Sequence, residues 1–339
     1  MRIVVDAMGG DGAPAVEVEG AVEALRRTED EVEIRLVGDE ARVRAELERL
    51  GAAGEKRLSI VHAPERIEMG EDPARQVRRK KGASIAVATR LLKNGDADGL
   101  VSAGNTGAVV ASSLLTLGRI PGVRRPGIAT FLPSPTGGAV LLDVGANSDC
   151  TPQHLVQFAI MGSIYARKIL GRKEPKVGLL NIGEESSKGN RLVQTTYPLL
   201  QQSSLNFVGN VEGRDIFRGG VDVVVCDGFV GNVVLKFSES VIHLMKHLVK
   251  EEIGNGLRPK LGALLLRPVF QRLSQQLNYE EYGGAPLIGI DGIVIIAHGS
   301  SSARAIASAV RVAVRFARER INDLIREELQ ETDLGQVSA

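Results

Sequence analysis

Five short segments of this sequence share one pattern, in which glycine and small polar residues follow an apolar run. In each segment the polar residues include serine, asparagine, aspartate, glutamate or histidine, and a helical pattern begins soon afterwards. The segments are 100–107, 142–147, 177–184, 223–228 and 293–300. Hydrogen-bond donors gathered in this way bind phosphate and stabilise a developing oxyanion. The pattern therefore indicates a site for an anionic substrate.

The apolar run in each segment is typical of a strand that is buried on both faces of a parallel sheet. Glycine lets the backbone approach a ligand closely, and the helix that follows presents unpaired N–H groups. The carboxyl ends of parallel strands meet at one edge of a sheet. We therefore expect the five segments to form one crevice, which we take to be the active site.

The polar groups expected in this crevice are hydrogen-bond donors rather than strong bases. They are the amides of Asn105, Asn147, Asn210 and Asn232, together with Lys188 and His298. Inorganic phosphate is already anionic near neutral pH, so a reaction in which phosphate is the nucleophile needs little beyond positioning and charge stabilisation. Each amide, taken singly, is also explained as an ordinary turn or cap residue.

Several common catalytic motifs are absent from the sequence. It has no GxGxxG after the first expected strand, no GxxxxGK[ST] and no GxSxG, which argues against dinucleotide binding, P-loop hydrolysis and serine hydrolase chemistry. His243 and His247 lack the intervening glutamate of a zinc motif, and we predict no metal site. Cys150 and Cys226 have no CxxC spacing, which favours a reducing compartment.

Composition narrows the class of protein further. Apolar residues make up 43% and charged residues 24%, as in a soluble globular protein, and the net charge of +1 gives no overall field for nucleic acid. Aromatic residues are only 4% with no Trp, so base-stacking platforms are not expected. Strand-like residues begin at Ile3, which leaves no room for a signal peptide, and no apolar run is long enough to span a bilayer. We predict a cytoplasmic protein that does not bind nucleic acid.

Strand and helix patterns alternate along most of the chain. Strands are expected at 3–5, 33–37 and 58–62 with helical patterns between them, and one long helix is expected from Ala303 to about Leu329. This alternation predicts an α/β fold, a three-layer α/β/α sandwich around a mostly parallel sheet. We expect one catalytic domain over 1–339, a helical excursion at 240–282 within it, and a frayed tail at 330–339.

Residues 240–282 depart from this alternation. Leucine and valine recur about every four residues from Leu257 to Leu277, and Pro268 must kink or start a helix there. The stretch 253–279 has no acidic residue but several basic ones. It is explained either as a core or dimer helix pair or as an amphipathic hairpin on an anionic membrane. The membrane interpretation assigns lipid contacts to Leu257, Leu261, Leu264, Leu265 and Arg267.

A basic cluster lies between residues 75 and 81. It consists of Arg75, Arg78, Arg79, Lys80 and Lys81. It is either a solvated surface or a docking patch for an anionic partner, because such clusters raise encounter rates with acidic surfaces.

Several sequence blocks, in this order, resemble the phosphate acyltransferase (PlsX) family of bacterial phospholipid synthesis. They are residues 4–14, 102–108, 143–147, 154–162, 181–189, 209–215 and 226–232. The resemblance runs from residue 3 to about 320. It implies a homodimeric fold like that of phosphotransacetylases and the isopropylmalate dehydrogenase group.

The resemblance also implies a reaction. Acyl-(acyl carrier protein) and inorganic phosphate would give acyl phosphate and free carrier protein, without a cofactor. The product would pass to a membrane glycerol-phosphate acyltransferase, and the enzyme would lie peripherally on the inner face of the cell membrane, with 253–279 as its membrane contact. The carrier protein is strongly acidic, which favours its docking at the basic cluster.

On this resemblance we expect phosphate to lie among Asn105, Asn147 and Lys188, with the thioester carbonyl near Gly228 or Gly299. Phosphate attacks directly, and His298 or a water protonates the leaving thiolate. Catalytic roles are thus expected for Lys188, Asn147 and His298. Contacts with phosphate or the thioester are expected for Ser102, Asn105, Thr106, Asp143, Asn210, Asp227, Asn232 and Ser300.

Two other functions are compatible with the same sequence. One is a phosphotransacetylase that uses acyl-coenzyme A, and the other is a membrane-associated scaffold whose crevice has lost catalysis. A dehydrogenase is supported only by analogy of fold.

Overall fold

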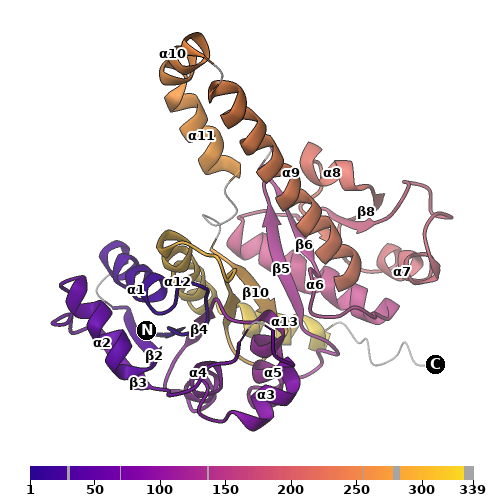
Figure 1. Ribbon diagram of the computed structural model, residues 1–339. Helices are drawn as coiled ribbons and strands as arrows, with labels where there is room; N and C mark the ends of the chain where they lie inside the picture. Colours follow the sequence, from indigo (N-terminus) through magenta and orange to yellow (C-terminus); the bar gives the residue numbers. More distant parts are fainter. Residues whose placement is uncertain (29–30, 69, 136, 255, 278–282, 332–339) are drawn as a thin grey trace.

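An eleven-stranded sheet runs through the whole protein, with helices on both of its faces (Figure 1). The structure is a computed structural model, which describes the chain except residues 29–30, 69, 136, 255, 278–282 and 332–339. The strand order is β3-β2-β1-β4-β11-β10-β5-β6-β9-β7-β8.

The first half of the sheet is parallel. It consists of β1 (Arg2–Asp6), β2 (Glu33–Gly38), β3 (Leu58–His62), β4 (Gly99–Ser102) and β11 (Val294–Ile296). Branched apolar side chains fill these strands and alternate between the two faces. Ile3 and Val5 lie in the core of one face, whereas Val4 lies in the core of the other.

The second half is also parallel within itself, but two antiparallel strands join it to the first. Its strands are β6 (Ala139–Leu142), β7 (Val177–Leu180), β8 (Phe207–Val211) and β9 (Val223–Val225). The joining strands β5 (Gly127–Leu132) and β10 (Ala285–Ile288) pair antiparallel with each other and with their outer neighbours β6 and β11. The mostly parallel sheet predicted from the sequence is therefore confirmed.

One face of the sheet is covered by two groups of helices. The first group is α1 (Ala15–Arg27), α2 (Glu40–Arg49) and α12 (Ala303–Arg318), and the second is α6 (Pro152–Ile169), α7 (Arg191–Gln201) and α13 (Ile321–Glu331). Helices α1 and α12 approach closely because Gly20 has no side chain. A Cβ there would lie 2.5 Å from Cβ of Ile306. Val312 contacts the cores under both groups, which places them on the same face.

The other face carries one continuous core. It is covered by α3 (Pro73–Arg79), α4 (Ser84–Lys93), α5 (Thr106–Thr116), α8 (Gly213–Arg218) and the start of α9 (Gly228–Gly254). Val4 and Leu100 from the first half of the sheet share this core with Leu141 and Val224 from the second. Helices thus cover both faces of the sheet, and the predicted three-layer α/β/α sandwich is confirmed.

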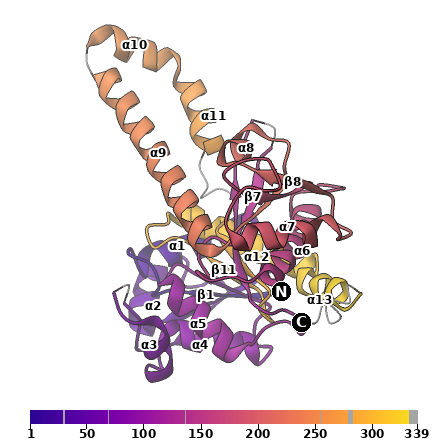
Figure 2. The same ribbon diagram turned by 90° about the vertical axis from the view of Figure 1, so that its right-hand side faces the viewer.

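A helical hairpin projects away from the sandwich, as Figures 1 and 2 show. It is formed by most of α9, by α10 (Leu257–Leu265) and by α11 (Arg267–Leu277). Pro268 is the second residue of α11, as expected for a proline at a helix start. Residues 278–282, the end of the expected excursion, lie outside the described residues.

The single helix predicted from Ala303 to about Leu329 is wrong, because the chain forms two helices there. Arg320, between α12 and α13, has a φ of 51°, in the left-handed region. The apolar stripe continues through the break, since Phe316 and Ile321 are both buried, and a spacing pattern alone therefore could not reveal it. Residues 330 and 331 of the expected tail belong to α13, and residues 332–339 lie outside the described part of the chain.

Candidate active site

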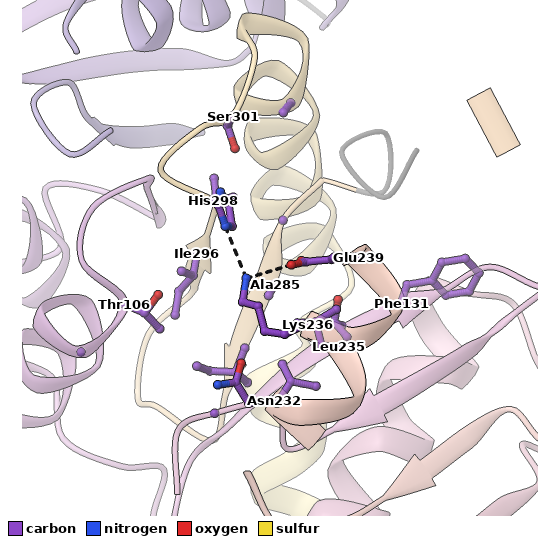
Figure 3. A pocket seen from close by; sticks show the side chains of 18 residues that line it. Thr106, Phe131, Asn232, Leu235, Lys236, Glu239, Ala285, Ile296, His298 and Ser301 are labelled. Atoms are coloured by element: carbon purple, nitrogen blue, oxygen red, sulfur yellow. Dashed lines mark hydrogen bonds and ion pairs between the residues drawn. The ribbon is translucent and has the colours of Figure 1, made fainter. Parts of the chain in front are cut away.

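A cavity of about 370 Å³ lies between the two halves of the sheet (Figure 3). Thr106 and Gly107 line it from the start of α5, and Gly145 from the loop after β6. Asn232 of α9 and His298, after β11, also line it. Four of the five sequence segments, or the helices that follow them, thus meet at one cavity.

The loop after β6 is organised by Asp143, which is fully buried. Its carboxylate accepts hydrogen bonds from the N–H groups of Ile128, Gly145, Ala146 and Asn147 at 2.8–3.1 Å. Burial raises the pKa of this carboxyl, and the N–H donors act in the opposite direction. Because the Asp143 carboxylate accepts hydrogen bonds from several backbone N–H groups of the protein, it fixes the shape of the loop beside the cavity.

Asn147 supports the same loop. Its amide nitrogen donates to the Pro126 carbonyl at 2.7 Å and to the Asp143 carboxylate at 2.9 Å. Helix α9 packs directly on this loop, since a Cβ on Gly231 would overlap the carbonyl oxygen of Asp143. Both amide hydrogens of Asn147 are therefore engaged within the protein.

The polar side of the cavity contains a row of three side chains that Figure 3 shows pointing toward one another. Lys236 Nζ lies 2.9 Å from Glu239 Oε2 and 3.4 Å from His298 Nε2. His298 Nδ1 lies 2.8 Å from Ser300 Oγ on its other side. The structure thus brings the predicted residues His298 and Ser300 together with two that the sequence analysis missed, Lys236 and Glu239.

A signal for the missed residues was present in the sequence. Lys236 and Glu239 follow Asn232 by four and seven positions, which is the spacing of one helix face. A helix that begins at a glycine-rich segment directs the same face toward the crevice for its first turns. The spacing from Asn232 could therefore have predicted that Lys236 and Glu239 face the crevice.

Apolar side chains make up another part of the cavity lining. Ile128 and Phe131 of β5, Val144, Leu235 and Ile296 line it. Phe131 is buried, and in Figure 3 it lies apart from the polar row. The cavity therefore offers both hydrogen-bond donors and hydrocarbon contact.

Two predicted residues at the end of β4 serve the framework of the site. Ser102 Oγ donates to the buried carboxylate of Asp6 at 2.7 Å, and burial raises the pKa of Asp6. Asn105 caps α5, accepting a hydrogen bond from the Ala108 N–H at 3.1 Å. These contacts fix where α5 begins and hence where Thr106 meets the cavity.

A buried carboxylate also lies beneath the loop that carries His298. Glu17 is 1% exposed and accepts a hydrogen bond from the Gly10 N–H at 2.9 Å, while its Oε2 has no partner among the described residues. The next N–H, that of Asp11, donates to the Gly299 carbonyl at 2.9 Å. Burial raises the pKa of Glu17 to about 7.

Lys188 and Asn210 are not brought to the cavity. Lys188 lies on the exposed loop after β7, and Asn210 Nδ2 donates to the Glu185 carbonyl of that loop at 2.9 Å. Strand β7 lies beyond β9 in the sheet, one position farther out than β9 and two positions farther out than β6. Asp227 instead caps α9, accepting from the Val230 N–H at 2.9 Å.

The basic cluster lies on and after α3, which packs against α5. Lys80 is paired with Glu71 at 2.8 Å, whereas the other four members, Arg75, Arg78, Arg79 and Lys81, are exposed. A Cβ on Gly107 would lie 2.7 Å from Pro73 Cγ, so the first residue of α3 touches a residue that lines the cavity. Arg75, Arg78 and Arg79 therefore lie on a helix that contacts the start of α5, and Lys81 follows that helix.

The predicted membrane residues lie at the tip of the hairpin. Leu261, Leu264 and Leu265 are 61%, 64% and 74% exposed, and Arg267 is exposed beside them. The side chain of Leu257 lies outside the described residues. Among the described residues, no helix has the length and apolarity needed to cross a bilayer. Nor does this part of the chain gather three or more metal-binding side chains of His, Cys, Asp or Glu.

The sandwich and its cavity define an α/β/α protein of the phosphotransacetylase fold. A phosphotransacetylase from Streptococcus pyogenes superposes with a TM-score of 0.62 at 21% identity, covering 94% of each chain. The EutD phosphotransacetylase from Staphylococcus aureus gives a TM-score of 0.59 at 18% identity, again covering 94% of each chain. At these identities the likeness establishes the fold.

Sequence comparison identifies the family. The family described as "Fatty acid synthesis protein" matches residues 1–324. The phosphate acyltransferase of Heliobacterium modesticaldum is 53% identical over 329 residues, covering 97% of this chain and 98% of the relative. That of Desulfitobacterium hafniense strain Y51 is 54% identical over 332 residues, covering 97% of each. The chain therefore belongs to the phosphate acyltransferase family, as the sequence blocks indicated.

Proposed function

We propose that this enzyme transfers a fatty acyl group from the thioester of acyl carrier protein to inorganic phosphate. The observation that carries the proposal is the mixed lining of the cavity, which combines hydrogen-bond donors with apolar side chains. An acyl thioester needs both, because its carbonyl and the attacking phosphate are polar and its chain is hydrocarbon. The names of the relatives give independent support for phosphate as the acyl acceptor.

The reaction balances without an added cofactor. A phosphate oxygen forms a bond to the carbonyl carbon, the carbon–sulfur bond breaks, and the proton of the hydrogen phosphate ends on the leaving thiol. His298 is the ionisable side chain best placed to pass that proton, since its ring lies in the cavity wall. Asn147 acts by holding the loop after β6 in shape.

The choice of carrier protein as donor rests on the four exposed cations of the basic cluster. Opposite charges accelerate association and orient the partners, so an acidic carrier docked on α3 would present its thioester arm at the rim of the cavity.

The hairpin supports a peripheral position on the inner face of the cell membrane. Exposed leucines with arginine beside them, and no acidic residue over 253–279, suit an anionic lipid surface. That position would deliver acyl phosphate to a membrane glycerol-phosphate acyltransferase in phospholipid synthesis. We further propose a homodimer, since α9 exposes Phe229, Val233 and Phe237 along its base.

Lys188 remains a predicted catalytic residue. If it stabilises charge in the transition state, Lys188→Ala should lower turnover by roughly 10- to 1000-fold, the effect of removing one such donor. Near-normal turnover would show that Lys188 has no part in the chemistry.

The direct test incubates the pure protein with palmitoyl-carrier protein and phosphate, without added metal or nucleotide, and traps acyl phosphate with hydroxylamine. Acyl hydroxamate that depends on phosphate is the expected result. Product with acyl-coenzyme A but not with carrier protein would indicate a phosphotransacetylase, and product with neither donor would favour the non-catalytic scaffold.

A further inference from the structure

Lys236 enters the cavity from the third turn of α9, and its ammonium group lies between Glu239 and His298. The contact with Glu239 is an ion pair at 2.9 Å, which holds the flexible lysine chain in one direction. The contact with His298 is not an ion pair. It joins two nitrogen atoms at 3.4 Å, and neither is obviously an acceptor.

The ring of His298 can be assigned from its other neighbour. The N–H group of Ser300 lies 3.3 Å from Nδ1 and can only donate, so Nδ1 accepts and the neutral ring carries its proton on Nε2. Ser300 Oγ, 2.8 Å from Nδ1, can donate to the same atom. The proton on Nε2 then points at the Lys236 ammonium, which has no lone pair.

Two donors therefore face each other without an acceptor between them. A donor pair of this kind is satisfied when an oxyanion takes a hydrogen bond from each side. Glu239 cannot fill this role for His298, because its carboxylate lies on the other side of Lys236 in Figure 3.

Two helix ends add to the same positive field. Thr106 and Gly107 are the first two residues of α5, which is 11 residues long, and both line the cavity. Ser301, directly before the cap of the 16-residue helix α12, lines it as well. The N-terminal end of a helix carries partial positive charge and unpaired N–H groups, so each end favours an anion at this place.

We propose that Lys236 and the Nε2–H of His298 together hold the inorganic phosphate that attacks the thioester. The inference rests on the proposed function, and it assigns to the phosphate site a cation, Lys236, that lines the cavity. In this arrangement Glu239 is a positioning residue that keeps the ammonium group aimed at the ion. As the thiolate departs, His298 gives it the Nε2 proton and takes the proton of the hydrogen phosphate in its place, which leaves the ring neutral.

The test compares Lys236→Gln with Lys236→Arg, which keeps the charge, and with Lys173→Gln, an exposed lysine remote from the cavity lining. For Lys236→Gln we expect KM for phosphate to rise roughly 10- to 100-fold, as for a lost charge-assisted hydrogen bond. Lys236→Arg should have a KM for phosphate close to that of the wild type, and Lys173→Gln should have the wild-type KM. Circular dichroism of each variant verifies folding.

Binding of inorganic phosphate is measured separately by isothermal titration without any acyl donor. Weaker binding in Lys236→Gln supports the inference even if no acyl phosphate forms, in which case the proposed reaction is the part that fails. Unchanged phosphate binding and unchanged KM for phosphate in Lys236→Gln would overturn the inference while leaving the reaction intact.

Discussion

Replacing Glu17 with glutamine should remove a specific part of the pH dependence of stability. Glu17 is buried beneath the loop of His298, with Asp6 and Asp11 raising its pKa further after burial itself. Glutamine keeps the acceptor for the Gly10 N–H but cannot ionise. The neighbouring Glu19 on α1 is exposed, so Glu19→Gln is a matched control on the same helix.

The magnitude follows from the shift of the pKa. The pKa of Glu17 rises from 4.5 to about 7 on folding. A group whose pKa is raised in the folded state contributes stability that is fully present below its unfolded pKa. That contribution is lost as pH increases from about 4.5 through about 7. At about 1.4 kcal/mol for each pKa unit, the wild type should lose about 3 kcal/mol from this group alone.

Urea unfolding of the three proteins at pH 5 and pH 8 measures this loss. The difference in unfolding free energy between wild type and Glu17→Gln should change by about 2 to 3 kcal/mol between the two pH values, in favour of the variant at pH 8. Glu19→Gln should track the wild type. A difference between wild type and Glu17→Gln that is the same at both pH values would refute a raised pKa at Glu17.

Four further results are expected. Asp143→Ala should lower the unfolding free energy by at least about 3 kcal/mol in urea titrations, because several buried N–H groups lose their acceptor; a smaller loss would mean that water replaces the carboxylate. Phe131→Ala should shift relative kcat/KM toward longer acyl chains by roughly tenfold, and an unchanged chain-length profile would place the chain elsewhere. Arg78→Glu with Arg79→Glu should raise KM for acyl-carrier protein while leaving KM for the uncharged acyl-pantetheine unchanged, and equal effects on both donors would argue against docking at α3. Leu264→Glu should reduce co-sedimentation with vesicles rich in phosphatidylglycerol, and undiminished binding would exclude the hairpin tip as the contact.

The general form of the fold could be predicted because each strand end is marked locally. Apolar runs closed by glycine and polar residues were sufficient to predict that Gly145 and His298 lie at one crevice, and both line the cavity. The direction of a strand is not marked in this way. An apolar run has the same pattern whether its neighbour is parallel or antiparallel, so the reversal at β5 and β10 could not be predicted.

The site itself was predicted only in part, and strand order is one reason. Lys188 follows a buried strand as His298 does, but β7 lies outside β9 and its loop does not line the cavity. Lys236 was missed for a different reason. A lysine three residues before a glutamate on a helix usually forms a solvated surface pair, and the spacing from Asn232 was the one sequence signal that this lysine faces the crevice.

The strand order also affects how the protein is made on the ribosome. Strand β4 pairs with β11, and helix α1 packs against α12. Both β11 and α12 come from the last part of the described chain. The second half of the sheet, β6 to β9, is by contrast complete within a continuous stretch of sequence. During synthesis the second half can therefore fold while the first still exposes a strand edge and an apolar helix face, a state open to aggregation. The first strands and helices of this chain would thus be among the last of its described elements to reach their final packing.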